Sequence, residues 1–539
     1  MFKPDTELTF LSTRGGSIKK LFLLLVLMSV SVAESAELEP IVVSSKQNHS
    51  QRDVLSSVSV YEVNSKDENS AARVIDLLDK IPGLEISKSG LLGGASGIFI
   101  RGQESRHTVI LIDGAKVYDP TSVSGSFNIN TLNIANIDRI EVLKGSQSVL
   151  YGSDAIGGVI NIITRKGAES GSIKLSGGYY QELAVSKAIS SKSSSLWLNG
   201  FFQESNFDSE AKDGSEKDTS LNRGMDLRYT KDFGQTIFGT SLKYAKNESE
   251  VDEYDYTENQ TIDDKTSNSS DELTRVGVNV ESEISNTLSL KSQINHSQYV
   301  RKIEFLNVSD YETLNYNGEH SEFELRANLR TLTGPIIFGV HSISESYEDD
   351  DISKKIITIN DFFVNEYIEG RKNFYEIGGR LTSSDHFGSH VVYGLGVGRR
   401  LDENYTLKLT NKTGYKAPSV YQLRAGEGSF GPIGNENLAP EKSISRDLSL
   451  NYKKEKISLG TSVFYNEVRN FIDFESGAGY VNDSFGIYRG AEFFGEYNGE
   501  KYRLDSSLTL LNISLSSGEQ AQRRPDFSYA LGLSNKFND

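Results

Sequence analysis

Alternating apolar and polar residues recur in many short segments of this 539-residue chain from about residue 169 onward. Examples are SIKLSGGYY, TIFGTSLKY and KISLGTSVFY. Because successive side chains of a β-strand point to opposite faces, each segment would present one mostly apolar face and one small or polar face. About 18 such strands can be placed, so the pattern predicts one very large antiparallel sheet. The alternative is a soluble β-sandwich.

The composition favours a sheet embedded in a membrane. Mean hydropathy is -0.40, which excludes a bundle of membrane helices. A transmembrane β-barrel needs apolar residues only on alternate positions. An open sheet in lipid would leave backbone N–H and C=O groups without partners, so we expect closure into a barrel. The net charge of -17 argues against nucleic acid as a partner, and the absence of cysteine excludes disulfides and thiolate metal sites.

The N-terminus carries an export signal. Lys19 and Lys20 precede the apolar run of residues 21–33, which ends in small residues. This order predicts a signal peptide, residues 1–33, cleaved near Ala33 or Ala36. The apolar run is too short to cross a bilayer as a helix. The alternative is a buried apolar helix.

A β-branched segment, EPIVVSS at residues 39–45, follows the signal. Pro40 disfavours a helix and the valines favour an extended chain. Such a segment can be added as a strand to the edge of a partner's sheet, which transmits force through main-chain hydrogen bonds.

The run of residues 138–167, DRIEVLKGSQSVLYGSDAIGGVINIITRKG, combines a strand signal with glycines that indicate tight turns. It resembles the end of the plug domain of TonB-dependent outer-membrane transporters. Ser146 stands where the family usually has proline. The matching positions are Arg139, Glu141, Gly145, Ser148, Tyr151, Gly152, Ala155, Gly157, Gly158 and Asn161.

The resemblance implies an all-β transmembrane barrel, of about 22 strands in the family, around an N-terminal α+β plug. The expected organisation is signal peptide 1–33, Ton box and linker 34–51, plug 52–167 and barrel 168–539. Only about 18 strands can be placed and Phe537 is followed by two polar residues, so we expect C-terminal truncation, with a narrower natural barrel as the alternative. The resemblance also implies a monomer in the Gram-negative outer membrane, in contact with lipid. Its periplasmic partner would be TonB, which would bind Glu39, Pro40, Ile41, Val42 and Val43.

Within the plug, residues 65–81 are predicted to form a helix ended by Pro82-Gly83. Two loops rich in glycine and serine, residues 87–96 and 115–126, are predicted to lie at the apex of the plug, where they could adapt to a ligand. The resemblance implies that Arg101 in the IRG turn and Asp113 in the IDG turn pair with the barrel wall, and solvated strand ends are the alternative.

Within this family the chain is most similar to cobalamin (vitamin B12) transporters, in the plug and in GYKAPSVYQL, NENLAPEKS and NEVRNFIDF. Two of the implied ligand contacts, Gly97 and Glu104, stand where the family has polar, uncharged side chains, which leaves a related corrinoid or another bulky chelate open. The full set of implied contacts is Ala95, Gly97, Glu104, Val123, Ser124 and Arg523.

The resemblance also implies Ca²⁺ in two acidic loops, held by Asp208, Asp218, Asp252 and Asp263. Calcium takes several oxygen ligands, but solvated acidic loops are an alternative explanation. No enzyme motif is found: His386 and His390 lie in a polar turn without the H-E-x-x-H pattern. An iron-siderophore importer and a passive barrel or adhesin remain alternatives to import of cobalamin or a related corrinoid.

Overall fold

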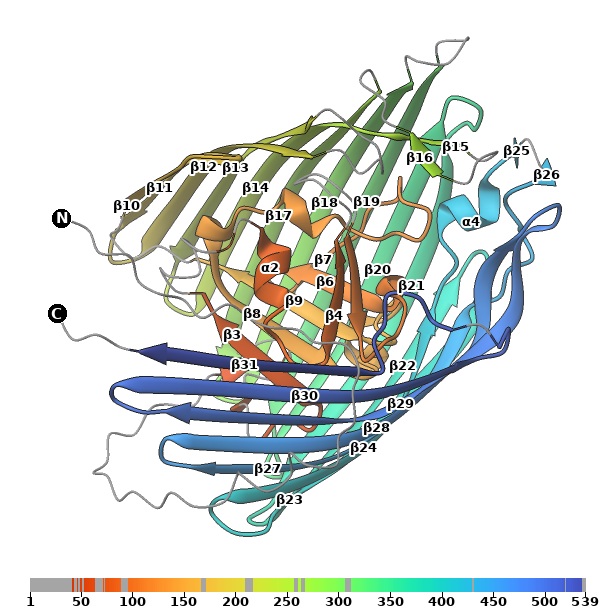
Figure 1. Cartoon of the computed structure of the whole chain (residues 1–539). Coiled ribbons are helices and arrows are strands. Elements are labelled where there is room, and N and C mark those ends of the chain that lie inside the picture. The colour runs from red at the N-terminus through yellow and green to blue at the C-terminus, as the bar shows by residue number, and fades with distance from the viewer. Residues whose placement is uncertain are drawn as a thin grey trace, which may run out of the picture.

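The computed structural model describes residues 41–42, 46, 49–50, 53–63, 71, 73–88, 96–165, 171–208, 217–255, 260–262, 267–305, 312–428, 431–518 and 520–535. They form a large curved sheet that wraps around a smaller N-terminal unit, the plug (Figure 1). The signal peptide, Glu39, Pro40, Val43, most of the first apical loop with Ala95, and Asp263 lie outside the described residues.

In the described residues the large sheet has 18 strands in sequence order, each paired antiparallel with the next, which confirms the predicted fold class and strand number. The strands are β10 (Gly171–Ser176), β11 (Tyr180–Ser190), β12 (Ser194–Asp208), β13 (Lys217–Asp232), β14 (Thr236–Glu250), β17 (Asn268–Ser285), β18 (Leu288–Phe305), β19 (Glu312–Arg330), β20 (Pro335–Asp349), β21 (Lys355–Glu369), β22 (Asn373–Ser384), β23 (Gly388–Arg400), β24 (Tyr405–Lys416), β27 (Glu441–Lys454), β28 (Ile457–Glu475), β29 (Gly479–Asn498), β30 (Tyr502–Leu515) and β31 (Phe527–Asn535).

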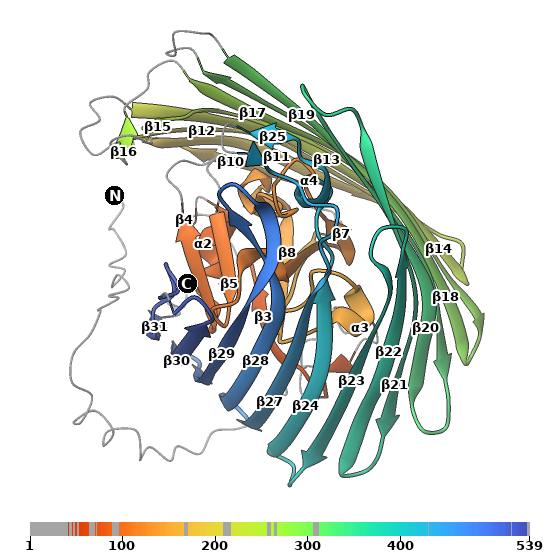
Figure 2. The same ribbon diagram turned by 90° about the vertical axis from the view of Figure 1, so that its right-hand side faces the viewer.

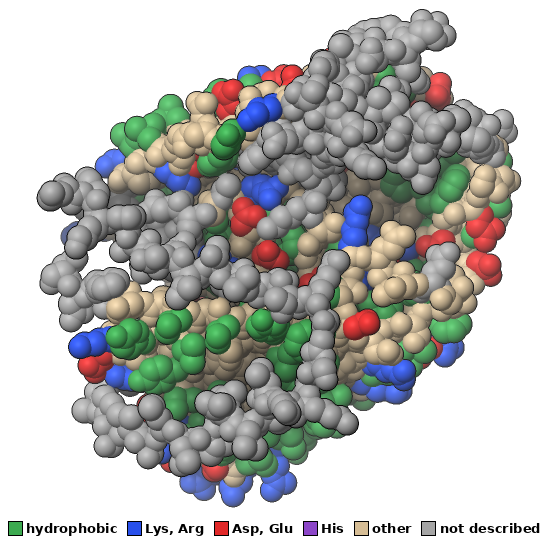
Figure 3. All heavy atoms as spheres, in the orientation of Figure 1, with side chains coloured by type: hydrophobic (Ala, Val, Ile, Leu, Met, Phe, Trp, Pro, Cys, Tyr) green, Lys and Arg blue, Asp and Glu red, His purple; other side chains and the backbone are tan. Residues whose placement is uncertain are grey.

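Burial alternates along these strands, as the sequence pattern predicts. In β11, Leu183 is 46% exposed on the outer face, whereas Ala184 is 2% exposed on the inner face. Hydrophobic side chains gather over β30 and β31, where Leu531 and Leu533 are exposed (Figure 3). An outward apolar face suits contact with lipid, and the inner face meets the plug.

The first and last strands of the sheet, β10 and β31, are not hydrogen-bonded to each other in the described part of the chain. The sheet therefore differs from the closed one that the lipid argument predicts, and Figure 2 shows the plug inside its curve. The plug adjoins β31, where the Ser528 hydroxyl donates to Glu85 at 2.6 Å.

The connections between strands differ at the two ends of the sheet. At one end they are short, such as residues 191–193 and 455–456, and at the other several are long, such as residues 417–440. Short turns are periplasmic and long loops are extracellular in outer-membrane barrels, so we call the second end the outer end. It carries two small hairpins, β15 (Glu253–Asp255) with β16 (Gln260–Ile262) and β25 (Glu427–Gly428) with β26 (Gly431–Pro432), and helix α4 (Val420–Arg424). In the described segments no helix has the length and hydropathy to span a bilayer.

The plug contains a five-stranded mixed sheet in the order β3-β8-β9-β6-β7. These strands are β3 (Ser57–Glu62), β8 (Ile137–Lys144), β9 (Gly158–Thr164), β6 (Thr108–Ile112) and β7 (Ala115–Val117), with β6 and β9 parallel. A separate hairpin joins β4 (Leu84–Lys88) and β5 (Ser96–Ile100). Short helical turns connect them: α2 (Val74–Leu78), α3 (Ser148–Tyr151), η2 (Ser105–His107), η3 (Ile129–Thr131) and η4 (Ile134–Asn136).

The predicted helix of residues 65–81 is shorter in the structure. Residues 65–70 lie outside the described part, and α2 begins only at Val74 because Arg73 has an extended backbone with φ -131°. The Arg73 N–H donates to the Asp76 carboxylate at 3.0 Å, which caps the helix start. Beyond Leu78 the chain turns toward Gly83, whose φ of +75° is incompatible with a helix.

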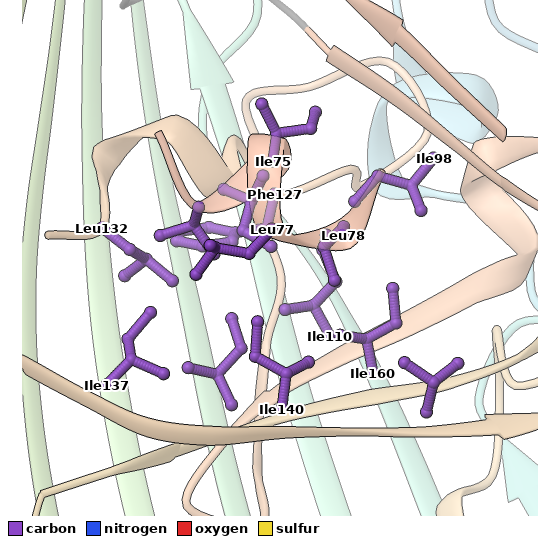
Figure 4. Close-up of a cluster of buried hydrophobic side chains, with 14 of the residues drawn as sticks. Ile75, Leu77, Leu78, Ile98, Ile110, Phe127, Leu132, Ile137, Ile140 and Ile160 are labelled. Carbon is purple, nitrogen blue, oxygen red and sulfur yellow. The ribbon is translucent and has the colours of Figure 1, made fainter. Parts of the chain in front are cut away.

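The core of the plug is aliphatic. Ile75, Leu77 and Leu78 of α2 pack with Ile140 of β8 and Ile160 of β9 (Figure 4), and each is essentially inaccessible to solvent. Burial of these side chains removes apolar surface from water, which is the main force that holds such a unit together.

The glycine-rich end of the plug has the predicted tight turns. Gly152 ends α3 with φ +72°. At Gly158, at the start of β9, an added Cβ would lie 2.3 Å from the carbonyl oxygen of Leu143, so a side chain cannot fit between β8 and β9 there.

Candidate ligand site and plug–barrel contacts

The described ligand-contact candidates lie near the outer end of the molecule. Gly97 is in β5, Glu104 precedes η2, and Val123 and Ser124 are in the second apical loop. Arg523 lies in the outer connection between β30 and β31. Val123 is 45% exposed, so it can be reached from the outside.

The second apical loop, residues 115–126, is held by the barrel from two sides. The Ser419 hydroxyl donates to the Val123 carbonyl at 2.6 Å, and the Lys416 ammonium donates to the Ser124 carbonyl at 3.3 Å. From β18, the Arg301 guanidinium forms an ion pair with Asp119 at 3.0 Å. The loop is therefore fixed before any ligand binds, which is more order than its glycine and serine content suggests.

A buried charge cluster supports this loop from below. The Asp154 carboxylate pairs with Lys116 of β7 and, at 2.7 Å, with Lys416 of β24. Burial alone would raise the pKa of Asp154, but the two lysines outweigh it and hold this pKa well below its usual value. A small cavity adjoins the cluster and is lined by Thr108, Lys116, Tyr118, Ser126 and Asp154, among others.

Glu104 is paired with an arginine of the last outer connection. Its Oε1 lies 2.8 Å from Nη2 of Arg524, and the Arg524 guanidinium stacks 4.5 Å from the ring centroid of Phe99. Arg523, the predicted contact, is exposed and has φ +60°. The structure thus brings Arg524, and not Arg523, to the other predicted residues, and the role of Arg523 stays a prediction.

A row of tyrosines lines the outer end of the barrel, and the sequence analysis did not identify it as a site. Tyr347 of β20 lies 6.4 Å from Tyr316 of β19 and 5.5 Å from Tyr421 of α4, between ring centroids. Tyr480 of β29 lies 6.2 Å from Tyr421. Only Tyr421 belongs to a quoted segment, GYKAPSVYQL, and the others meet it through tertiary structure.

The charges of the IRG and IDG turns pair with the barrel wall, which confirms the prediction. Arg101 is 1% exposed and forms ion pairs with Asp447 at 2.6 Å and Glu492 at 2.9 Å. Lys144 of β8 reaches the same Glu492 at 3.4 Å. Asp113 pairs with Arg228 of β13. Burial opposes the charge of Arg101, but Glu492 and Asp447 raise its pKa above the usual value.

The predicted TonB-binding segment is only partly described. Its residues Ile41–Val42 form β1, which pairs with β2 (His49–Ser50). Between them, the buried Lys46 ammonium lies 2.5 Å from Glu324 of β19 and 4.7 Å from the ring centroid of Tyr151. Burial lowers the pKa of Lys46 to about 8 despite this ion pair. The chain just after the segment is therefore anchored inside the barrel.

Of the four candidate calcium ligands, the structure describes the side chains of two. Asp218 is buried at the outer start of β13, and Asp252 is half-buried just after β14. For Asp208 only the backbone is described, opposite Lys217 and one register position from the Phe207–Asp218 pair. Among the described residues, no group of three or more His, Asp or Glu side chains is placed to hold a metal ion. The His386 Nε2–H donates to the Glu436 carbonyl at 2.9 Å, as expected of a turn residue.

Comparison with known proteins identifies the family. The family TonB-dependent Receptor Plug Domain matches residues 50–159, and the family TonB dependent receptor-like, beta-barrel matches residues 171–538. The chain belongs to the TonB-dependent receptors. It is therefore an outer-membrane protein of TonB-dependent import and not an enzyme.

Two relatives and two solved structures show how far the similarity extends. The vitamin B12 transporter BtuB of Vibrio vulnificus (strain CMCP6) is 26% identical over 83% of this chain and 73% of its own length. That of Vibrio cholerae serotype O1 (strain M66-2) is 24% identical over 93% and 83%. The ferric yersiniabactin uptake receptor FyuA from Yersinia pestis superposes with a TM-score of 0.72 at 16% identity, over 90% of this chain and 84% of that one. The siderophore receptor PirA from Acinetobacter baumannii gives 0.70 at 18%, over 90% and 84%. At such identities the structural likeness concerns the fold.

Proposed function

We propose that this receptor imports cobalamin or a related corrinoid, energised by TonB through residues 39–45. The observation that carries the proposal is the similarity to vitamin B12 transporters, which spans 83% of the chain in one relative and 93% in another. It includes the plug, where the exposed Val123 and the neighbouring Ser124 lie in a loop held by the barrel.

The mechanism follows from the two ends of the plug. A ligand bound to the second apical loop would displace or strengthen the contact between that loop and Lys416. Lys416 also pairs with Asp154, so the change would reach the rest of the plug. At the opposite end, the segment that TonB would bind is tethered through Lys46. Binding outside and availability of the segment below would then be coupled through the plug, which is a coupling free energy between two sites.

Calcium is part of the proposal. Asp218 and Asp252 flank the outer end of the β13–β14 pair, where the Thr219 N–H already donates to Glu250 at 2.6 Å. Oxygen ligands gathered at one rim are what Ca²⁺ requires, and the ion would reduce repulsion between them.

The test is equilibrium binding of cyanocobalamin to the membrane-extracted protein. One sample contains Ca²⁺ and a matched sample is treated with EGTA. Tight binding that weakens without calcium supports both parts of the proposal, and equal binding in both samples removes the calcium part. Absence of binding by folded protein, together with binding of a ferric siderophore, would assign the receptor to iron uptake. Deletion of residues 39–45 should abolish uptake but leave binding intact, which separates active import from a passive barrel or adhesin.

A further inference from the structure

Four cations share the outward face of β27, β28 and β29, three strands that lie side by side in Figure 2. All four are exposed: Lys442 and Arg446 of β27, Arg469 of β28 and Arg489 of β29. Arg446 and Arg489 both lie opposite Tyr465 of β28, and Lys442 lies opposite Arg469. Because paired strands are about 4.8 Å apart, the four side chains form one surface, which we call the cation patch.

The cation patch lies at the outer border of the apolar belt that faces lipid. Arg489 is eight residues from Tyr497, which is 40% exposed near a short turn, and Phe493 between them is 43% exposed. On β28, Val463 is 57% exposed and lies two residues from Tyr465, toward the short turn. Eight residues of a tilted strand rise about 20 Å, which is close to the height of the apolar band of such barrels. The cations are therefore at the level of lipid headgroups and not of hydrocarbon.

The patch has more positive charge than its carboxylates balance. Between Tyr465 and Arg469, the outward face of β28 carries one carboxylate, Glu467. Glu467 already accepts hydrogen bonds from both neighbours, from Nε of Arg469 and from the Tyr465 hydroxyl at 3.0 Å. Asp473 and Asp483 lie farther toward the outer end. Four cations thus accompany a single carboxylate that is already engaged.

The two arginines opposite Tyr465 are oriented by neutral groups. Nε of Arg446 donates to Oδ1 of Asn411 at 3.3 Å, and Nε of Arg489 donates to Oδ1 of Asn512 at 2.9 Å. A guanidinium has five N–H donors, so most of each group is available to an acceptor outside the protein.

Other parts of the sheet at a similar distance from the short turns lack such an excess of charge. On β13 and β14, Arg223 and Lys246 both pair with Glu248, at 3.0 and 2.8 Å. On β18 and β19, the outward positions are His296 and Ser321, which lie opposite each other. The excess is therefore a local property of β27–β29.

We propose that the cation patch binds the phosphate groups of an anionic lipid of the outer leaflet, whose acyl chains lie along the apolar belt. Guanidinium groups bind phosphate oxygens through paired N–H···O bonds, and each cation near a membrane surface adds to the attraction for anionic lipid. The two rows of the patch are four residues apart, about 13 Å along the strand, which suits a lipid with two separated phosphates. This inference is independent of the imported ligand, because the patch faces lipid.

Mass spectrometry of the intact receptor in detergent counts bound lipid directly. The probes are lipid A, which carries two phosphates, and the same lipid with both phosphates removed. The wild-type receptor should bind lipid A about tenfold more tightly than the dephosphorylated lipid. The double variant Arg446→Gln/Arg489→Gln should lose most of this preference, while its affinity for the dephosphorylated lipid stays the same. Retention of the full preference in the double variant overturns the inference.

The matched control is the double variant Arg223→Gln/Lys246→Gln, which removes two cations at a similar height and should keep the preference. If both double variants lost it equally, total charge and not the patch would attract the lipid, which overturns the inference. Glu467→Gln should strengthen lipid A binding about threefold, a gain that misfolding cannot produce, and unchanged binding would count against the patch. Inorganic phosphate at equal concentration should not displace lipid A, and displacement would assign the patch to free anions in place of lipid.

Discussion

Two regions of the plug are held by different forces. Its interior is aliphatic, with Ile75, Ile140 and Ile160 fully buried among other hydrocarbon side chains. Its boundary with the barrel is ionic, with Arg101 and Lys144 on Glu492 and with Lys116 and Lys416 on Asp154. Both regions are buried, but only the second depends on the pairing of charges.

The difference matters because a buried ion pair adds little over a well-packed apolar contact, yet loss of one partner is very costly. Ionic boundaries therefore specify one docked position of the plug without making it inseparable from the barrel. A boundary made of aliphatic side chains would allow the plug to dock in several positions against the barrel. The plug interior can be aliphatic because it does not separate during transport.

The largest effect is expected for Glu492→Gln. It removes the charge that pairs with the buried Arg101 and Lys144. We expect the free energy of plug docking to become less favourable by about 3–5 kcal/mol. The chain contains one tryptophan, Trp197 of β12, whose indole N–H donates to Asn136 of the plug at 2.6 Å. Its fluorescence during urea titration in detergent micelles reports docking directly.

The control for this variant is Glu496→Gln on the same strand. Glu496 is 39% exposed and pairs with Arg503 at 3.3 Å, so its loss should shift the titration little. Equal shifts in the two variants would mean that the buried cluster does not hold the plug in place.

A smaller effect is expected for Ile160→Ala in the plug interior. Removal of buried methylene groups at a fully buried position should cost about 3 kcal/mol, through lost burial and the cavity left behind. Hydrogen exchange of the plug amides should speed up, while affinity for the ligand stays the same. A change in affinity with no change in exchange would contradict the division between interior and boundary.

Much of this architecture could be predicted from sequence because it follows from local periodicity. Alternation predicted the 18 strands. The pairing of Arg101 with the barrel wall came from the family resemblance, because the position of Arg101 after a strand is equally compatible with a solvated end. The prediction named Arg523 and did not consider Arg524, and sequence alone gives no means to choose, since neighbours in an irregular connection carry no periodicity. The tyrosine row was missed for a related reason: Tyr316, Tyr347 and Tyr480 come from distant strands, and only the barrel places them together.

Acid should weaken the boundary before the interior. The pKa of Asp154 is held low by Lys116 and Lys416, so its stabilising contribution is present above the ordinary value of 3.8 and is lost as pH falls through the lowered one. The Trp197 titration should therefore show weaker docking below about pH 4. In Asp154→Asn this part of the pH dependence should disappear, and asparagine tolerates the φ of +77° at that position. An unchanged acid profile in the variant would exclude Asp154 as its source.

The smallest effect is expected for an ion pair that solvent reaches. Lys456 and Glu500 are 3.2 Å apart at neighbouring short turns, and the Glu500 side chain is 81% exposed. Glu500→Gln should change docking by less than about 0.5 kcal/mol, and any change should vanish as salt is raised. The distance between Lys144 and Glu492 is similar. A difference between the effects of Glu500→Gln and Glu492→Gln on docking therefore reports burial of the ion pair and not its geometry. If Glu500→Gln cost as much as Glu492→Gln, total charge at the barrel and not desolvation at its boundary would hold the plug.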